Sequence, residues 1–224
     1  MTKSIYFFYN SILVQSPTFK DYLIDQGVDE KKIIYYPYYA ESFYDIVNPK
    51  PMVKQMFPIG LNILFAGNIG VAQSFDTIIE AVKIISKNIR NFNIIILGEG
   101  RDKKRVLEKI NTLNLNNHFK FLGSFPPEQM ADFFASADAL LVTLKKTTIF
   151  SMTIPGKLQS YLACGRPIIA SLDGIGAEII QESSSGYVTP SEDSRGLAES
   201  IISFEHLSVE QRSEFGANAR KCFE

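Results

Sequence analysis

One run in the C-terminal third of the chain combines residue types that bind anions. It reads Thr153-Ile-Pro-Gly-Lys157-Leu-Gln-Ser-Tyr161-Leu-Ala-Cys-Gly165-Arg-Pro167-Ile-Ile-Ala170. Pro155 and Gly156 are placed to open a helix that would end at Gly165, before a short apolar strand. The open amides and positive dipole end of a helix N-terminus attract anions. A lysine in the first turn opposes that dipole unless an anion lies there, so we expect Lys157 to contact a phosphorylated ligand.

Glycine-rich turns follow three predicted strands and could face the same ligand. They are Gly67-Asn-Ile-Gly70, Gly98-Glu-Gly100 and Gly123-Ser124. The first resembles a truncated dinucleotide-binding fingerprint, but it lacks the third glycine and an acidic residue at the expected distance. A plain tight turn explains the first two equally well, because glycine adopts conformations that other residues avoid.

These turns need a scaffold, and the surrounding pattern predicts one parallel sheet. Strands are expected at Asn62–Ala66, Asn93–Leu97, Phe119–Leu122, Ala139–Thr143, Pro167–Ser171 and Gly186–Thr189. Helices are expected at Phe75–Ile89, Asp102–Leu113, Pro127–Ser136, Pro155–Ala163, Gly176–Gln181, Ser194–Phe204 and Ser208–Glu224. Apolar strands alternating with helices are typical of an α/β doubly wound, Rossmann-like layer with both faces covered. Ligands bind off the carboxyl ends of such strands, where the glycine turns lie.

The first part of the chain has its own short alternation. Ile12–Ser16 predicts a strand, a helix begins at Pro17 and ends at Gly27, and Lys32–Tyr36 predicts a second strand. Residues 46–60 carry three prolines and little periodicity, so we expect a linker there.

The composition excludes several classes of function. A net charge of −1 gives no field that favours nucleic acid, and no apolar run approaches the ~20 residues needed to span a bilayer. Cys164, Cys222, His118 and His206 are too far apart to form a metal-ligand motif. We therefore expect a cytoplasmic protein with no bound metal, no cofactor and no nucleic-acid partner.

Taken in order, the loops resemble the donor-binding half of a family-4 (group 1) glycosyltransferase of the GT-B fold. The segments that carry this resemblance are Ile63-Leu-Phe-Ala-Gly67-Asn, Ile94-Ile-Ile-Leu-Gly-Glu-Gly100, Phe119-Lys-Phe-Leu-Gly123, Ala137-Asp-Ala139 and Tyr161-Leu-Ala-Cys-Gly-Arg-Pro-Ile-Ile169. The resemblance implies that 1–45 is the tail of the N-terminal acceptor domain and 46–60 a linker. It makes 61–205 the donor-binding domain and 206–224 the start of a C-terminal crossover helix.

The resemblance implies transfer of a sugar, with retention, from a nucleotide-sugar to a glycan or lipid-linked acceptor. The donor is expected to be a UDP-sugar, which that family uses most. Lys157 is the expected catalytic residue, because a cation and helix amides can stabilise the charge left on the β-phosphate. The other expected donor-binding residues are Gly67, Asn68, Gly70, Gln73, Glu99, Gly100, Ser124, Met152, Thr153, Pro155, Gly156 and Ser160.

This sequence departs from the family pattern at four positions. Asn68 and Gln73 stand where the family usually places cations, and Met152 and Ser160 stand where it often places glutamates that contact the sugar and the ribose. The form of Pro155–Tyr161 is similar to a bacterial branch that acts on 6-deoxy-amino sugars. That branch includes the L-fucosamine transferases of capsule and O-antigen synthesis, which would place the chain at the inner face of the cytoplasmic membrane.

A complete enzyme of this type has two Rossmann domains. We therefore expect the missing N-terminal domain or a separate subunit as partner, and little or no transfer by the isolated chain. Two alternatives stay open. Loss of both glutamates favours a non-catalytic nucleotide-sugar-binding subunit. A two-Rossmann nucleotide-sugar epimerase would need an acid–base set that His118 and His206 are poorly placed to supply.

Overall fold

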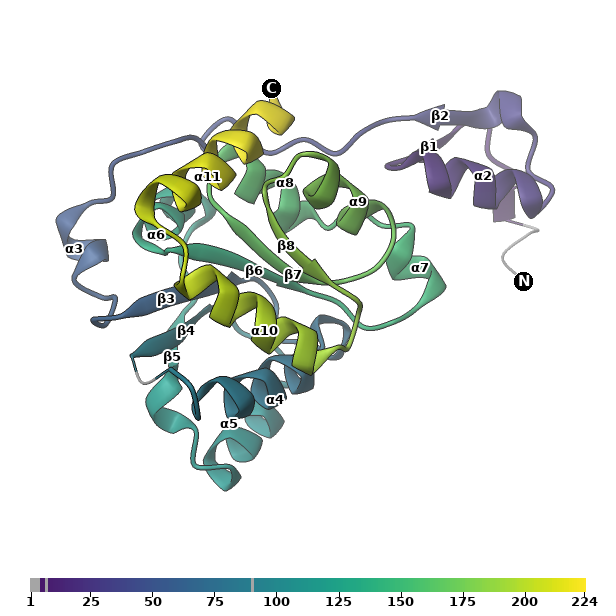
Figure 1. The fold of residues 1–224 in the computed structure, drawn as a ribbon. Helices are drawn as coiled ribbons and strands as arrows, with labels where there is room; N and C mark the ends of the chain where they lie inside the picture. The colour runs from purple at the N-terminus through teal and green to yellow at the C-terminus, as the bar shows by residue number, and fades with distance from the viewer. Residues whose placement is uncertain (1–4, 7, 90) are drawn as a thin grey trace.

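The computed structural model describes residues 5, 6, 8–89 and 91–224, and its main body is one six-stranded sheet (Figure 1). Its strands are β3 (Leu61–Ala66), β4 (Phe92–Leu97), β5 (Phe119–Gly123), β6 (Ala139–Thr143), β7 (Ile168–Ser171) and β8 (Gly186–Thr189). Every pair is parallel, in the order β5-β4-β3-β6-β7-β8. The chain therefore starts at the centre, winds to one edge and returns to wind to the other, which confirms the doubly wound α/β prediction.

Helices cover both faces of this sheet. They are α4 (Phe75–Ile85), α5 (Lys103–Thr112), α6 (Met130–Ser136), α7 (Thr148–Ser151), α8 (Gly156–Ala163), α9 (Ile175–Glu182), α10 (Ser194–Glu205) and α11 (Val209–Phe223). Short 3-10 turns are η1 (Glu30–Lys32), η2 (Val71–Gln73), η3 (Asn116–His118) and η4 (Pro127–Gln129). Among the described helices, none is both long and apolar enough to traverse a lipid bilayer.

Two apolar cores form because strand side chains alternate between the faces. Ile63 and Phe65 pack with α4, α5 and α10, whereas Leu64 packs with α6, α8 and α9 on the other face (Figure 1). Strand β3 is buried at every position, as expected for a strand with a neighbour on each side. Because β3 is held in place by its neighbours, the turn that follows Ala66 also has a defined position.

A smaller unit precedes the main sheet and lies apart from it in Figure 1. Strands β1 (Ile12–Val14) and β2 (Ile33–Tyr35) pair in parallel, and α2 (Pro17–Asp25) packs against them. Ser16 accepts a hydrogen bond from the Phe19 N–H and so caps α2. The same hydroxyl donates to the Met152 carbonyl at 2.6 Å, which connects this unit to the main body.

Apart from shifts of up to three residues at the ends of elements, the structure differs from the expected elements in three places. Segment 46–60 contains a short helix, α3 (Pro51–Lys54), because Pro51 suits the first turn of a helix. Helix α4 ends at Ile85, four residues earlier than expected. Helix α7 was not predicted, although Thr147 caps it by accepting from the Phe150 N–H.

Candidate functional site

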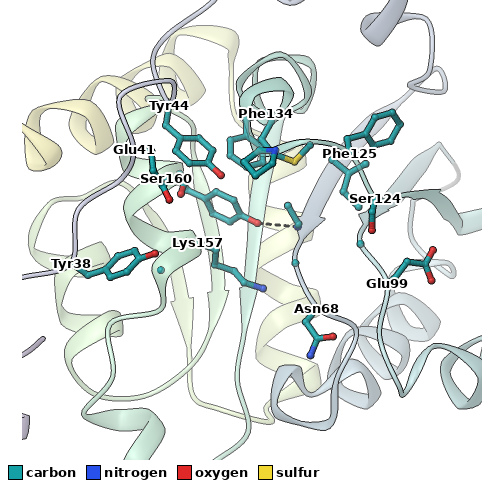
Figure 2. Close-up of a pocket in the computed structure, with 18 residues that line it drawn as sticks. Tyr38, Glu41, Tyr44, Asn68, Glu99, Ser124, Phe125, Phe134, Lys157 and Ser160 are labelled. Atoms are coloured by element: carbon teal, nitrogen blue, oxygen red, sulfur yellow. Dashed lines mark hydrogen bonds between the residues drawn. The ribbon is translucent and has the colours of Figure 1, made fainter.

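A cavity of about 560 Å³ opens at the carboxyl ends of β3 and β4, beside the N-terminus of α8 (Figure 2). It is lined by Tyr38, Glu41, Tyr44, Ala66, Gly67, Asn68, Leu97, Gly98, Glu99, Ser124, Phe125, Pro127, Met130, Phe134, Gly156, Lys157, Ser160 and Tyr161. Its volume lies within the roughly 300–1,000 Å³ typical of small-molecule sites. The cavity is where an open parallel sheet is expected to bind a ligand.

Many of the residues expected from the sequence meet at this cavity. Those that line it are Gly67, Asn68, Glu99, Ser124, Gly156, Lys157 and Ser160. Those that do not are Gly70, Gln73, Gly100, Met152, Thr153 and Pro155. Gln73 nevertheless contacts a residue of the cavity wall, because its side-chain oxygen accepts a hydrogen bond from Lys157 Nζ at 2.8 Å.

Lys157 is the only cation among the described side chains that line the cavity. It lies in the first turn of α8, and its ammonium is 3.7 Å from the centroid of the Phe65 ring. Within the described part of the chain, no carboxylate forms an ion pair with it. Burial lowers the pKa of Lys157 to about 7, because the charged form is poorly solvated there. A bound anion would stabilise the charged form.

The start of α8 supplies further donors. Helix geometry leaves the first N–H groups of a helix without an acceptor, so the amides of Gly156 and Lys157 are available to a ligand. Pro155 precedes them with an extended backbone and no side-chain cap. An uncapped helix start beside a lysine is well suited to bind an anion.

The two glycine turns pack against each other, backbone to backbone. Gly67 and Gly98 have φ angles of +140° and +137°, and a Cβ on Gly98 would lie 1.9 Å from the Gly67 carbonyl oxygen. The Gly67 N–H donates to the Leu97 carbonyl, and the Gly98 N–H donates to the Gly123 carbonyl. These two amides are therefore hydrogen-bonded within the fold. Because the glycines have no side chains, the floor of the cavity at these turns consists of backbone alone.

Met152, Thr153 and Pro155 lie just before α8 and make other contacts. The Met152 side chain is buried and its carbonyl accepts from Ser16. The Thr153 hydroxyl donates to the Ile149 carbonyl at 2.7 Å. None of these three residues lines the cavity.

Aromatic residues that were not among the expected site residues form much of the cavity wall. Tyr44 stacks on Phe134 with the ring centroids 5.9 Å apart, and a Cβ on Gly156 would lie 3.2 Å from the Tyr38 ring. Tyr161 is buried, and its hydroxyl accepts a hydrogen bond from the Ala66 N–H at 3.0 Å, drawn dashed in Figure 2. Burial raises the pKa of Tyr161, so it stays neutral.

The segment before α3 contributes Tyr38, Glu41 and Tyr44 to this cavity. Tyr38 belongs to an aromatic cluster at Tyr35–Tyr39 that no basic residues interleave, so its residue types alone do not mark a ligand site. Nothing in the spacing shows that this segment folds back over α8. Neither His118 nor His206 lines the cavity, since His118 stacks on Phe92 and His206 is exposed.

The sequence profile of the family described as "Glycosyl transferases group 1" matches residues 60–222. WcaL of Escherichia coli K12, named for colanic acid biosynthesis, is 24% identical over 178 residues, covering 79% of this chain and 43% of WcaL. The amylovoran biosynthesis glycosyltransferase AmsK of Erwinia amylovora is 25% identical over 143 residues, covering 63% of this chain and 35% of AmsK. The chain thus spans less than half the length of these curated relatives.

Solved structures share the fold at low identity. HepE of Anabaena, crystallised with UDP, superposes with a TM-score of 0.77 at 17% identity over 96% of this chain and 58% of its own. The C-terminal domain of LpcC from Francisella tularensis superposes with a TM-score of 0.63 at 20% identity, over 79% of this chain and 93% of its own. The chain therefore belongs to the group 1 glycosyltransferases, and its main sheet is the C-terminal half of their GT-B fold.

Proposed function

We propose that this chain binds the donor of a retaining glycosyltransferase, and that the donor is a UDP-sugar. The observation that carries the proposal is Lys157, a partly buried cation without a carboxylate partner among the described residues, at the open N-terminus of α8. Breaking the bond between sugar and diphosphate leaves negative charge on the β-phosphate. Lys157 and the first amides of α8 stabilise that charge, and they do so most when it is fully developed.

The shape of the cavity supports a nucleotide. Its end near Lys157 suits a diphosphate, and its other end is lined by the apolar side chains of Met130, Phe125 and Phe134, which suit a base. Relatives of the same fold have been crystallised with UDP and with UDP-glucose, which supports uridine as the base. The remaining expected donor-binding residues, including those outside the cavity wall, stay predictions.

The biological setting follows from the relatives and the motif. WcaL and AmsK are named for the biosynthesis of colanic acid and of amylovoran, which supports a glycan or lipid-linked acceptor. The form of Pro155-Gly156-Lys157 supports a 6-deoxy-amino sugar on the donor. We expect the acceptor to be held by an N-terminal domain or a separate subunit that packs on residues 1–45. We also expect the 224-residue chain alone to transfer sugar weakly or not at all.

Calorimetric titration of the purified chain with UDP, GDP and ADP tests this proposal. We expect UDP to bind and Lys157→Ala to weaken it by roughly tenfold or more, because a charge-assisted contact is lost. Lys104→Ala is the matched control, since that lysine is 91% exposed on α5. Absence of binding by all three nucleotides to a folded chain would contradict the proposal.

A second candidate function is a binding subunit without transfer activity. It is favoured by the Met152 side chain, which is buried outside the cavity, and by Ser160, which offers a hydroxyl where the family often has a carboxylate. An assay of sugar transfer, with the chain, an acceptor-domain partner and UDP-sugar mixed, distinguishes the two candidate functions. Turnover that depends on Lys157 supports the enzyme, and UDP binding without turnover supports the subunit.

A further inference from the structure

We propose that Glu41 determines the specificity of the cavity for ribonucleotides, its carboxylate accepting hydrogen bonds from the ribose hydroxyls of the donor. This inference rests on the proposed function and assigns a residue that lies outside residues 60–222, the part that matches the family. Figure 2 shows Glu41 with Tyr44 and Ser160 on the α8 side of the cavity, and Glu99 with Ser124 on the other.

Glu41 is a carboxylate with free acceptors. Two carboxylates line the cavity, and the other, Glu99, forms an ion pair with Lys103 at 2.6 Å. Among the described residues no cation or hydrogen-bond donor contacts the Glu41 carboxylate. It can therefore accept hydrogen bonds from a ligand without breaking an existing interaction.

The position of Glu41 along the cavity matches a ribose. Ser160 follows Gly156 by four residues on α8, so it lies on the same helix face about 6 Å further from the N-terminus. Figure 2 shows the Glu41 and Ser160 side chains beside each other, next to the Tyr44 ring, and all three line the cavity. Glu41 thus lies at the level of Ser160.

The order of chemical groups along the cavity is then that of a nucleotide. In Figure 2 the cation at Lys157 lies at one side of the cavity, the hydroxyl of Ser160 and the carboxylate of Glu41 lie next, and the apolar rings of Phe134 and Phe125 lie beyond them. A diphosphate, a ribose and a base follow one another in the same order. Charge-assisted hydrogen bonds between hydroxyl donors and a carboxylate are among the stronger ones, so they discriminate well.

The test compares UDP with 2′,3′-dideoxy-UDP, which lacks both ribose hydroxyls, by titration calorimetry of the 224-residue chain. We expect the wild-type chain to bind UDP about tenfold or more tightly than the dideoxy analogue. Glu41→Gln and Glu41→Ala should weaken UDP binding and bring the two affinities to within about twofold. Glu182→Gln is the charge-matched control, because Glu182 is exposed on α9 and does not line the cavity.

Each outcome decides the matter. If the wild-type chain binds UDP and the dideoxy analogue with equal affinity, the inference is overturned. This comparison needs no variant, so it holds even if Glu41→Ala does not fold. UDP binding and discrimination that survive in a folded Glu41→Gln would also overturn it, while leaving the proposed donor site intact. If UDP, GDP and ADP all fail to bind the wild-type chain, the proposed function fails, and the inference fails with it.

Discussion

The ammonium of Lys157 lies 3.7 Å from the centroid of the Phe65 ring, so the cation faces an aromatic side chain instead of a carboxylate. A ring face attracts a cation, although less than an opposite charge would. Gln73 adds one neutral hydrogen bond to Nζ. Together they hold the lysine in place but do not offset its burial, and the pKa of Lys157 falls to about 7.

This pKa predicts how UDP affinity depends on pH. Above pH 7, Lys157 loses its charge in the empty site. UDP binding must then be accompanied by proton uptake at Lys157, so the dissociation constant of UDP should rise by up to tenfold per pH unit. Below about pH 6 the terminal phosphate of UDP itself becomes protonated, which also weakens binding. We therefore expect the tightest binding between about pH 6 and 7, measured by calorimetry in buffers that differ in ionisation heat.

Lys157→Gln is the control for the pH effect, because it removes the titrating group and retains a polar side chain. Its UDP affinity should be weaker and flat between pH 7 and 9. A wild-type chain whose affinity is equally flat over this range, with no proton uptake, would show that Lys157 is not the titrating contact.

The close packing of the two glycine turns predicts that Gly98→Ala is costly. Its Cβ would lie 1.9 Å from the Gly67 carbonyl oxygen at a φ of +137°. We expect the free energy of unfolding in urea to fall by about 3 kcal/mol, from overpacking and backbone strain together. Gly27→Ala is the matched control, since Gly27 also has a positive φ but no atom within 4 Å. It should cost only about 1 kcal/mol. Similar losses in both variants would mean that strain alone, and not the contact with Gly67, constrains Gly98.

The hydrogen bond between Tyr161 and Ala66 predicts a stability loss in Tyr161→Phe. The substitution keeps the ring but leaves the buried Ala66 N–H without its acceptor at the end of β3. We expect a loss of about 1–3 kcal/mol in the free energy of unfolding, together with faster hydrogen exchange of the Ala66 amide. Tyr36→Phe, at an exposed tyrosine, should change neither quantity. Unchanged exchange at Ala66 in Tyr161→Phe would mean that the hydroxyl does not protect this amide.

The strands of the main sheet were predictable because their signals are local. Leu61–Ala66 and Phe92–Leu97 are short, mostly apolar runs that end at glycines, and such runs are typical of parallel strands with both faces covered. The end of α4 was less predictable, since Ile89 follows Ile85 at the four-residue spacing of a helix although α4 ends at Ile85. Helix ends depend on competing local hydrogen bonds, which periodicity does not report.

The part of the cavity that we propose binds the diphosphate was also predictable from the sequence, because an open helix N-terminus and a lysine are neighbours in the chain. The opposite wall was not. Tyr38 and Gly156 are 118 positions apart in the sequence, and their contact depends on the path that the chain takes between the two sheets. Thr153 shows the converse, since it lies near Lys157 in the sequence but turns its hydroxyl to Ile149.

The doubly wound sheet, the glycine turns at its carboxyl edge and the lysine at the start of α8 were therefore predictable from the residues alone. Each of these is signalled by residue types and spacings that are local in the chain. Only the tertiary structure decided that Glu41 and Tyr44 complete the cavity and that Phe65 lies against Lys157. Burial and the meeting of distant segments are properties of the packed chain, and they set the charge state and the shape of the site.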